Sequence, residues 1–384
     1  MVGPKLVIKL GTSSLFDEAT GEHRLSNMSQ IVEQVVALRK RGYRVCLVSS
    51  GAIAAGLRRL NLDHRPKHNA QLQATAATGQ ARLIRLWDNL FSHFDTAVGQ
   101  VLLTRNDIAH RSSYLNAANT INALLDMDIV PIVNENDTLS TYEIRFGDND
   151  TLSAVTGAMI GADMLFLLTD VDCLYTSNPR NNPDAQPIRI VENAQEIKRD
   201  PSMSQGSGVG TGGMTTKLIA ANLATSAGIT TYICRSFVIG SVFNILDDVE
   251  KKISPLESNH LYTRFDAHPS IKDRAFWLLH GLKPHGSITI DAGAFRALSR
   301  RDRAGLLPVG LVAVSGSFHE SECVNIFVQE KPEPVGRCLV NYTSVELDRI
   351  KQHHSHDIPQ ILGYTESEYV AFRDNIALFP DPVV

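Results

Sequence analysis

Short apolar segments rich in β-branched residues alternate with longer segments of helical periodicity over the first two-thirds of the sequence. This alternation limits the fold more than any other feature, because strands separated by helices form a parallel sheet that helices cover on both faces. The expected strands are residues 5–10, 44–51, 97–104, 129–134, 164–170 and 230–235. The expected helices are residues 29–42, 71–91, 111–127 and 151–162, and one that contains Lys217. The sequence therefore predicts an α/β protein, a three-layer α/β/α sandwich with a mainly parallel central sheet.

The pattern changes after about residue 247, where sheet-like regularity is lost. From Gly286 onward, short strands alternate with turn residues, which predicts a small, mostly β module. A chain of 384 residues is also long enough for two domains. We expect a first domain at residues 1–260, a connector at 261–284, the β module at 285–364 and a C-terminal tail at 365–384.

The composition argues against several classes of partner. A hydrophobic content of 43% and a charged content of 20% are those of ordinary soluble globular proteins. The formal net charge of -4 offers no electrostatic attraction to nucleic acid or to a membrane surface. The five cysteines are scattered, which favours buried thiols in a reducing compartment. The N-terminus lacks a signal-peptide pattern, and no apolar segment approaches the ~20 residues of a membrane-spanning helix. We expect a cytoplasmic protein.

A glycine-rich segment, residues 206–213, precedes Lys217 at the start of an expected helix. Its glycines match G-x-G-x-x-G, but no strand precedes them and the acid that a dinucleotide site needs further along the chain is absent. The phosphate-loop pattern also fails, because Leu218 follows Lys217 where that loop needs Ser or Thr. What remains is a loop whose backbone N–H groups, with Lys217, hold a phosphate near a helix N-terminus. The alternative is a surface loop that caps a helix.

Two other turns follow expected strands. In KLGTSS, Lys9 ends the first strand and a glycine turn with three hydroxyl residues follows; in SSGAIAAG, residues 49–56, small residues follow the second strand. Ligands of parallel sheets bind beyond the carboxyl ends of the strands, and small residues let a ligand approach the backbone. The alternatives are an edge strand whose lysine reaches water and ordinary tight packing of a βα turn. The two segments alone leave both alternatives open.

Carboxylates and amides are concentrated in VNENDT, residues 133–138, and FGDNDT, residues 146–151. They include Asn134, Glu135, Asp137, Asp148, Asn149 and Asp150. Neighbouring carboxylates repel each other, so such a cluster needs a cation, either an ammonium substrate or a hard metal ion. The alternative is an Asx-rich turn with an N-cap, but a cap needs a single Asp or Asn. The number of polar side chains favours a binding site.

Two further segments carry polar groups. Thr169, Asp170 and Asp172 directly follow the most apolar expected strand, where Asp170 can orient lysines or approach a cation; the alternative is a strand-ending turn. The segment KQHHSHD, residues 351–357, does not have the ligand spacing of a zinc site. We therefore predict no metal site in this segment, and we assign no residue of the chain as a metal ligand.

The segments occur in an order and at spacings that resemble one family. VIKLGTS, VSSGAIAAG, VNENDT, GDNDTLSA, LLTDVDCLYTSNP and GTGGMTTK closely resemble the bacterial glutamate 5-kinases, a branch of the amino acid kinase superfamily. GTGGMTTK and the NEND–GDND pair are specific to this branch, whereas KLG and SGA also occur in aspartate, uridylate and carbamate kinases. The resemblance covers nearly the whole chain, and the β module is similar to the PUA domain that many members carry. Cys173 departs from the family, which usually has glycine there, and this puts the local turn geometry in doubt.

The resemblance implies a set of site residues. Lys9, Lys217 and Asp170 would be catalytic: the lysines would contact the ATP phosphates, and Asp170 would hold both lysines in place. The nucleotide side would comprise Lys9, Thr169, Asp170, Thr211, Gly212, Gly213, Met214, Thr215, Thr216 and Lys217. Glutamate would bind to Ser50, Asp137 and Asn149, with Asn134, Asp148 and Asp150 close by.

The implied reaction transfers the γ-phosphoryl group of ATP to the side-chain carboxylate of L-glutamate, the first step of proline biosynthesis. Mg²⁺ would accompany ATP, held mainly by phosphates and water. The resemblance also implies a homo-oligomer that proline inhibits. Two alternatives stay open: a sister kinase acting on aspartate or acetylglutamate, and an RNA-binding or regulatory PUA protein. The near-neutral charge of the β module argues against the second.

Overall fold

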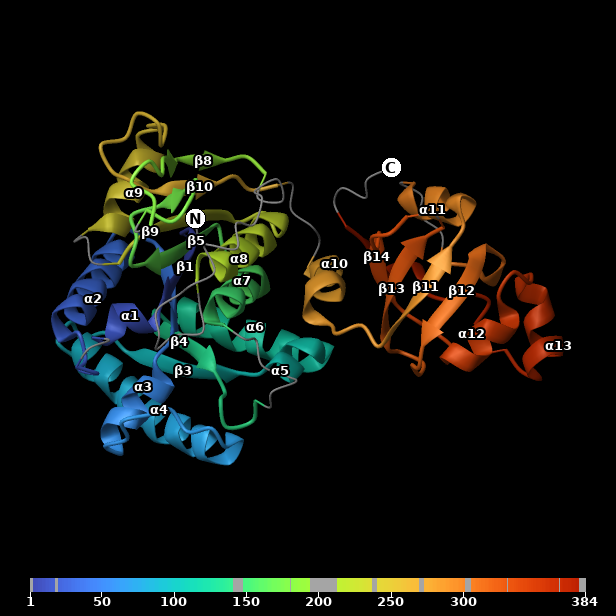
Figure 1. Ribbon diagram of the computed structural model, residues 1–384, viewed down its shortest axis with the longest axis horizontal. Helices are drawn as coiled ribbons and strands as arrows, with labels where there is room; N and C mark the ends of the chain where they lie inside the picture. Colours follow the sequence, from blue (N-terminus) through green and yellow to red (C-terminus); the bar gives the residue numbers. More distant parts are fainter. Residues whose placement is uncertain are drawn as a thin grey trace. The chain divides into compact units, whose positions relative to one another are not determined.

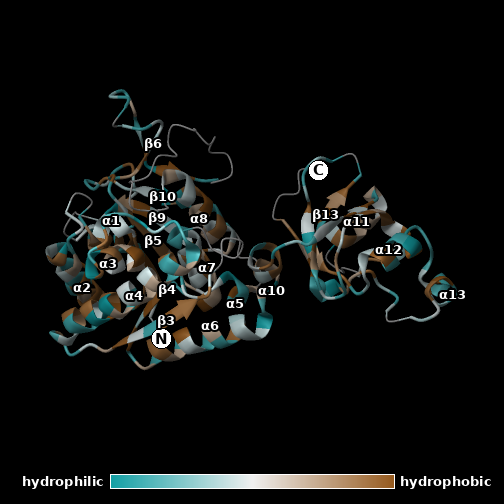
Figure 2. Ribbon diagram, turned by 60° about the horizontal axis from the view of Figure 1, so that its bottom comes forward, coloured by the Kyte–Doolittle hydropathy of each residue, from teal (hydrophilic) through white to brown (hydrophobic). Residues whose placement is uncertain are grey.

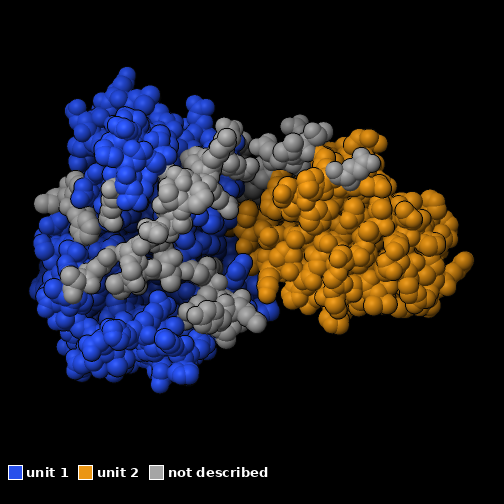
Figure 3. Space-filling model, viewed as in Figure 1, with its two compact units in different colours: residues 1–270 blue, residues 271–384 orange. Residues whose placement is uncertain are grey.

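The computed structural model describes residues 3–17, 20–140, 148–179, 181–193, 213–236, 240–268, 273–300, 305–329, 331–365 and 367–379. The chain forms two compact units, residues 1–270 and residues 271–384 (Figure 3). Each unit has a sheet and a hydrophobic core of its own.

The first unit is built on a sheet that has eight strands within the described residues, in the order β3-β4-β2-β1-β5-β9-β10-β8 (Figure 1). The strands are β1 Lys5–Leu10, β2 Arg44–Ser49, β3 Val98–Leu103, β4 Val130–Glu135, β5 Met164–Thr169, β8 Ile190–Val191, β9 Thr230–Arg235 and β10 Thr263–Phe265. Neighbouring strands are parallel except β9 and β10. A separate ribbon pairs β6 Leu174–Tyr175 with β7 Pro187–Ile188. The predicted, mainly parallel sheet is confirmed.

Helices cover both faces of this sheet (Figure 1). One face carries α2 Leu25–Lys40, α4 Asn69–Ser92 and α9 Ser241–Glu250; the other carries α6 Arg111–Asp126, α7 Asn149–Ile160 and α8 Met214–Ser226. The shorter helices are α1 Thr12–Leu15, α3 Ala52–Arg59 and α5 Arg105–Ala109. In Figure 2 the strands are largely hydrophobic, while the helices turn hydrophilic residues outward. The predicted three-layer sandwich is confirmed. Among the helices that the structure describes, none combines the length and hydrophobicity of a membrane span.

Strand β1 shows how the sequence divides the two faces. Successive side chains of a strand point to opposite faces, and Leu6, Ile8 and Leu10 belong to the core beneath α2, α4 and α9. Lys9 therefore points to the other face, the one that α7 and α8 cover. Because β1 lies between β2 and β5 in the middle of the sheet, the ammonium group of Lys9 is directed into a buried layer.

The second unit contains a sheet with five strands in the described residues, ordered β12-β11-β13-β14-β15. They are β11 Gly286–Ile290, β12 Leu311–Gly316, β13 Cys323–Val328, β14 Gly336–Leu339 and β15 Ile376–Leu378. Its helices are α10 Asp273–Phe276, α11 Ala292–Ser299, α12 Ser344–Ile350 and α13 Ile358–Leu362, with a π-helix at Trp277–Gly281. Single 3₁₀ turns lie at Pro308–Gly310, Ser355–Asp357 and Arg373–Asn375. The predicted small, mostly β module is confirmed.

The limits of the two units differ from the expected domain limits. Strand β10 lies in the expected connector, 261–284, yet pairs with β9 of the first sheet, and the second unit starts at residue 271. Strand β15 lies in the expected tail, 365–384, yet pairs with β14. Each of these strands has three residues. Such short strands carry too little sequence pattern to be predicted, because their pairing partners define them.

The second unit contains a half-buried histidine, His280. His280 packs against the rings of Phe276 and Phe379, with centroid distances of 4.9 and 6.4 Å. Its Nε2 atom is buried and has no hydrogen-bond partner among the described residues. Burial, assisted by the nearby charge of Arg337, lowers the pKa of His280 to about 4. The imidazole is therefore neutral in the folded protein near neutral pH.

We expect His280 to make the second unit less stable in mild acid. Its pKa returns to about 6.5 in the unfolded chain. Between pH 7 and pH 5 the unfolded state therefore binds a proton at this residue, whereas the folded state does not. This residue should lower the free energy of unfolding by about 2 kcal/mol over that interval. Urea denaturation of a Trp87→Phe background, followed by the fluorescence of Trp277, measures the effect. Adding His280→Leu should remove that part of the pH dependence, and an unchanged slope would contradict the assignment.

Candidate active site

Several predicted site residues lie at one edge of the first sheet. Strands β1, β2, β4 and β5 are parallel, so their carboxyl ends share that edge. Helices α7 and α8 lead into β5 and β9, which run in the same direction, so both helices begin at this edge. Ligands of open α/β sheets bind at this edge, where helix N-termini and strand ends meet.

A buried carboxylate lies between two lysines at this edge. Lys9 Nζ is 2.6 Å from Asp150 Oδ1, and Lys217 Nζ is 3.4 Å from Asp150 Oδ2. The exposed fractions of the three side chains are 4%, 0% and 8% for Lys9, Asp150 and Lys217. The hydroxyl of Thr216 donates to Asp150 Oδ2 at 2.7 Å and accepts the N–H of Gly213 at 3.0 Å. The predicted convergence of Lys9 and Lys217 is confirmed; we call these two residues and Asp150 the ion cluster.

The start of helix α7 explains the position of Asp150. Asp148 is the N-cap and accepts the backbone N–H of Thr151 at 2.7 Å. Asp150 follows in the first turn, where the helix dipole favours a negative charge. Helix α8 begins after Gly213 and packs against α7, which brings Lys217 in its first turn to the same carboxylate.

Burial and charge act against each other in the ion cluster. Burial lowers the pKa of Lys9, and the attraction of Asp150 opposes that shift while the charge of Lys217 adds to it. Burial would raise the pKa of Asp150, but the charges of Lys9 and Lys217 outweigh it, together with the hydrogen bonds from Lys9 and Thr216, and hold the pKa at about 2. Burial also raises the pKa of Asp148, against its hydrogen bonds from Thr151. Asp150 is therefore an ionised carboxylate that contacts the side chains of both lysines.

A second group of polar side chains lies next to Asp150, and we call it the amide cluster. Asn149 Nδ2 donates to Ser50 Oγ at 2.9 Å, to the Ser49 carbonyl at 3.0 Å and to Asn134 Oδ1 at 3.0 Å. Asn134 Nδ2 donates to Gln80 Oε1 at 2.7 Å. Residues from the ends of β2 and β4, the start of α7 and the middle of α4 are thus joined. Ser50, Asn134 and Asn149, three of the predicted substrate residues, are brought together.

The predicted substrate residue Asp137 lies in the turn after β4, half-buried. The N–H of Asn136 donates to the Leu103 carbonyl at 2.8 Å, and Ser140 Oγ donates to Glu135 Oε1 at 2.9 Å. These hydrogen bonds tie the turn that contains Asp137 to the end of β3 and to the end of β4.

Comparison with known proteins agrees with this geometry. The sequence profile of the amino acid kinase family matches residues 4–235, and the profile of the PUA domain matches residues 286–362. The chain belongs to the amino acid kinase family.

Similar proteins place the chain in the glutamate 5-kinase branch of that family. A probable glutamate 5-kinase of Schizosaccharomyces pombe is 56% identical, over 97% of this chain and 93% of its own length. An uncharacterized protein of Saccharomyces cerevisiae is 48% identical over 98% of both chains. A glutamate 5-kinase of Rippkaea orientalis is 45% identical, over 97% of this chain and 98% of its own length. The similarity therefore spans both units.

The predicted nucleotide residues of this amino acid kinase lie partly within the described structure. Thr169 ends β5, its hydroxyl donates to Asp170 Oδ1 at 3.1 Å, and its carbonyl accepts the N–H of Ser236 at 2.8 Å. Gly213, Met214, Thr215 and Thr216 form the start of α8. Thr211 and Gly212 lie outside the described residues.

We expected Asp170 to hold the two lysines in place, but the carboxylate that lies between them is that of Asp150. The reason lies in the alternation of β1, which directs Lys9 toward the helix layer of α7 and α8 rather than along the strand ends. Asp170 follows the end of β5, whereas Asp150 belongs to α7 itself. The assignment of Asp170 to the nucleotide side stays a prediction.

Helix α4 supplies contacts that the sequence reasoning missed. Gln73 Nε2 donates to the Ser140 carbonyl at 3.2 Å, Gln80 accepts from Asn134, and Trp87 Nε1 donates to Ser49 Oγ at 3.2 Å. The three residues are spaced at intervals of seven, so they lie on one face of the helix. Polar side chains at that spacing were the signal that could have identified this face.

The cysteine that departs from the family causes no backbone strain. Cys173 is fully buried and is not among the residues with positive φ. Its position therefore does not require glycine. The next residue, Leu174, donates its N–H to Thr263 Oγ1 at 2.8 Å, which ties the turn to β10. The doubt about the local turn is resolved.

Asp150→Asn should destabilise the first unit, because it leaves two buried ammonium groups without a counter-charge. Breaking a buried ion pair costs about 3–5 kcal/mol in free energy of unfolding. Chemical denaturation of the variant and the wild type measures this loss. Asp88→Asn, at an exposed position on α4, is the matched control and should change stability by less than about 0.5 kcal/mol. Equal stabilities of the Asp150 variant and the control would contradict the role of Asp150.

Proposed function

We propose that this chain transfers the γ-phosphoryl group of ATP to the side-chain carboxylate of L-glutamate, forming L-glutamyl 5-phosphate and ADP. The observation that carries the proposal is the ion cluster beside the amide cluster, at the carboxyl edge of a parallel sheet. The glutamate 5-kinases similar to this chain along most of their length support the choice of substrate. Such a reaction is the first step of proline biosynthesis.

The acceptor of this reaction needs no general base. A glutamate side chain has a pKa of about 4.3 and is already ionised at neutral pH. The difficulty is electrostatic, because an anionic carboxylate must approach an anionic triphosphate and charge spreads over the transferring oxygens. A site for this reaction must therefore supply preorganised positive charge and N–H donors.

Lys9 and Lys217 supply that charge in our proposal. Each ammonium group has three N–H donors, and Asp150 faces both, so donors remain for phosphate oxygens. Asp150 positions both lysines and does not itself contact the reacting atoms. Gly11 lies beside Lys9: a Cβ at that position would be 3.7 Å from Lys9 Nζ. The first-turn N–H groups of α8 add donors at a helix N-terminus.

Glutamate binds, in our proposal, between the amide cluster and the neighbouring acids. Ser50, Asn134 and Asn149 offer hydrogen-bonding groups to the substrate carboxylates, while Asp137 and Asp148 attract its ammonium group. Asp148 fits this role because its burial disfavours the ionised form, which a bound ammonium group would restore.

In our proposal, Mg²⁺ binds together with ATP, as part of the substrate. Within the described residues, no group of three or more His, Cys, Asp and Glu side chains is arranged to hold a metal ion. The buried carboxylate of Asp150 already faces two ammonium groups. Mg²⁺ characteristically keeps several waters and binds substrate phosphates through few protein ligands.

The remaining assignments rest on the family resemblance. We propose a cytoplasmic homo-oligomer that proline inhibits as the end product. We assign no separate activity to the PUA domain of the second unit.

Lys9→Ala and Lys217→Ala should each lower kcat by about 100-fold or more, because each removes charge that stabilises the transition state. The KM for glutamate should change far less. A coupled ADP-release assay with glutamate, aspartate and acetylglutamate measures both quantities and the choice of substrate. Lys251→Ala, on the surface at the end of α9, is the control and should keep wild-type kinetics. Normal turnover in either lysine variant, or turnover with another acceptor in place of glutamate, would refute the proposal.

Asp137→Ala should raise the KM for glutamate by roughly tenfold or more, because it removes a charge-assisted contact to the substrate ammonium group. The KM for ATP should stay close to the wild-type value. Asp88→Ala is the matched control on the surface of α4. An unchanged KM for glutamate in the Asp137 variant would show that the substrate binds elsewhere.

A further inference from the structure

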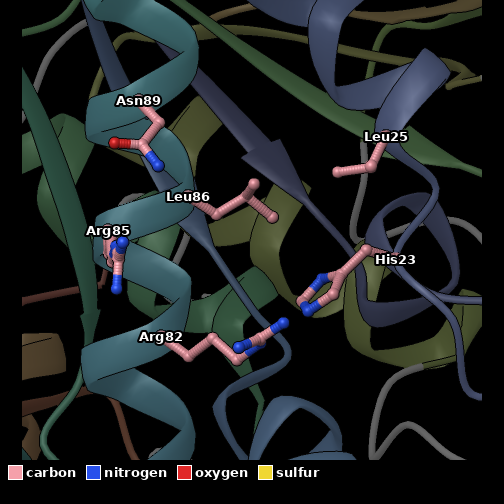
Figure 4. Close-up of a pocket in the computed structure, with 6 residues that line it drawn as sticks. All are labelled: His23, Leu25, Arg82, Arg85, Leu86 and Asn89. Carbon is pink, nitrogen blue, oxygen red and sulfur yellow. The ribbon is translucent and has the colours of Figure 1, made fainter.

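A cavity of about 330 Å³ lies in the first unit, between α4 and the segment that leads into α2 (Figure 4). His23, Leu25, Arg82, Arg85, Leu86 and Asn89 line it. The ion cluster and the amide cluster contribute none of these residues, so the cavity is separate from the candidate active site. Its volume is at the lower end of the range for small-molecule pockets, about 300–1,000 Å³.

The described lining of this cavity is cationic. Arg82 and Arg85 are exposed residues one helical turn apart on α4. Neither guanidinium has a hydrogen-bond or ion-pair partner in the part of the chain that the structure describes. The described lining residues include no carboxylate. Two like charges at this spacing repel each other, and a bound anion would remove that repulsion.

His23 adds unused hydrogen-bonding groups to the same cavity. Both ring nitrogens are buried and have no partner among the described residues. Figure 4 shows them on the side of the ring that faces the guanidinium of Arg82. Burial lowers the pKa of His23, and the charges of Arg82 and Arg58 lower it further. An anion between the ring and Arg82 would accept a hydrogen bond from each and offset the guanidinium charge.

The cavity also has an apolar side. Leu25 is 52% exposed, and Leu86 is half-buried; Figure 4 shows both side chains directed toward the space beside His23. A purely inorganic anion would leave these two side chains in water. We propose that the cavity binds a small organic anion, with its carboxylate or phosphate group between Arg82, Arg85 and His23 and its apolar part on Leu25 and Leu86.

Two structural links join this cavity to the amide cluster. Phe16 pairs with His23 through backbone hydrogen bonding, and their rings lie 4.5 Å apart between centroids. The ring of Phe16 packs against Gly51, where a Cβ would lie 2.6 Å from Phe16 Cε2, and Gly51 directly follows Ser50. On α4, Arg82 lies two residues beyond Gln80. An anion in the cavity should therefore change the KM for glutamate, an expectation that rests on the proposed function.

Isothermal titration of the full chain with phenyl phosphate, benzoate and inorganic phosphate tests the site. We expect phenyl phosphate or benzoate to bind with a submillimolar Kd and inorganic phosphate to bind at least tenfold more weakly. The comparison of the first two probes distinguishes a phosphate ligand from a carboxylate ligand. Arg82→Gln, Arg85→Gln and His23→Phe should each weaken binding, the arginine variants by tenfold or more. Lys40→Gln, at an exposed position at the end of α2, is the control and should not weaken it.

Absence of binding by both organic probes, or equal binding by the variants and the wild type, would overturn the site. The kinetic link has a separate readout: at saturating probe, the KM for glutamate should change at least twofold in the wild type and stay constant in Arg82→Gln. An unchanged KM in the wild type would overturn the link. Because titration calorimetry requires no catalysis, failure of the anion site and failure of the proposed kinase function are distinguishable.

Discussion

The carboxylate of Asp150 is the constraint on which the arrangement of the first unit depends. Two ammonium groups are buried within reach of it, and each would be costly to bury alone. One carboxylate reaches both only because three elements meet: the middle strand β1 directs Lys9 into the helix layer, and α7 and α8 begin side by side at the carboxyl edge. The layered fold therefore allows a single carboxylate to offset the burial of two lysine side chains.

Helix α4 supports the amide cluster from the face of the sheet opposite to α7. Gly56 of α3 and Gly79 of α4 allow the two helices into contact: a Cβ on Gly79 would lie 1.8 Å from the Ala52 carbonyl oxygen. The same contact brings Gln80 to Asn134 and fixes α3, whose start follows Ser50 and Gly51. Close helix packing and the geometry of the amide cluster thus depend on the same two glycines, so an added side chain would disturb both.

The alternation of strands and helices predicted the parallel sheet and its two covered faces, because periodicity is a local property. The convergence of Lys9 with Lys217 was implied by the family resemblance. The sequence did not identify the partner of the lysines, since Asp150 precedes an apolar helix and Asp170 follows an apolar strand, and only the direction of Lys9 separates them. Gln80 and the strand β10 were missed for a related reason. Tertiary contacts define the role of a glutamine within an amphipathic helix and the pairing of a three-residue strand. Neither can be recognised from the local sequence.

The stoichiometry of the ion cluster, two lysines to one carboxylate, has a chemical consequence. With a single lysine the buried pair would be neutral and could not attract a triphosphate. With two lysines and no carboxylate, burial and mutual repulsion would push the pKa of Lys9 down and favour loss of a proton before the nucleotide arrives. Asp150 opposes that shift, and the cluster has a net positive charge when both lysines are protonated. In our proposal, the two lysines are therefore already positioned in the free protein and need not be brought together when ATP binds.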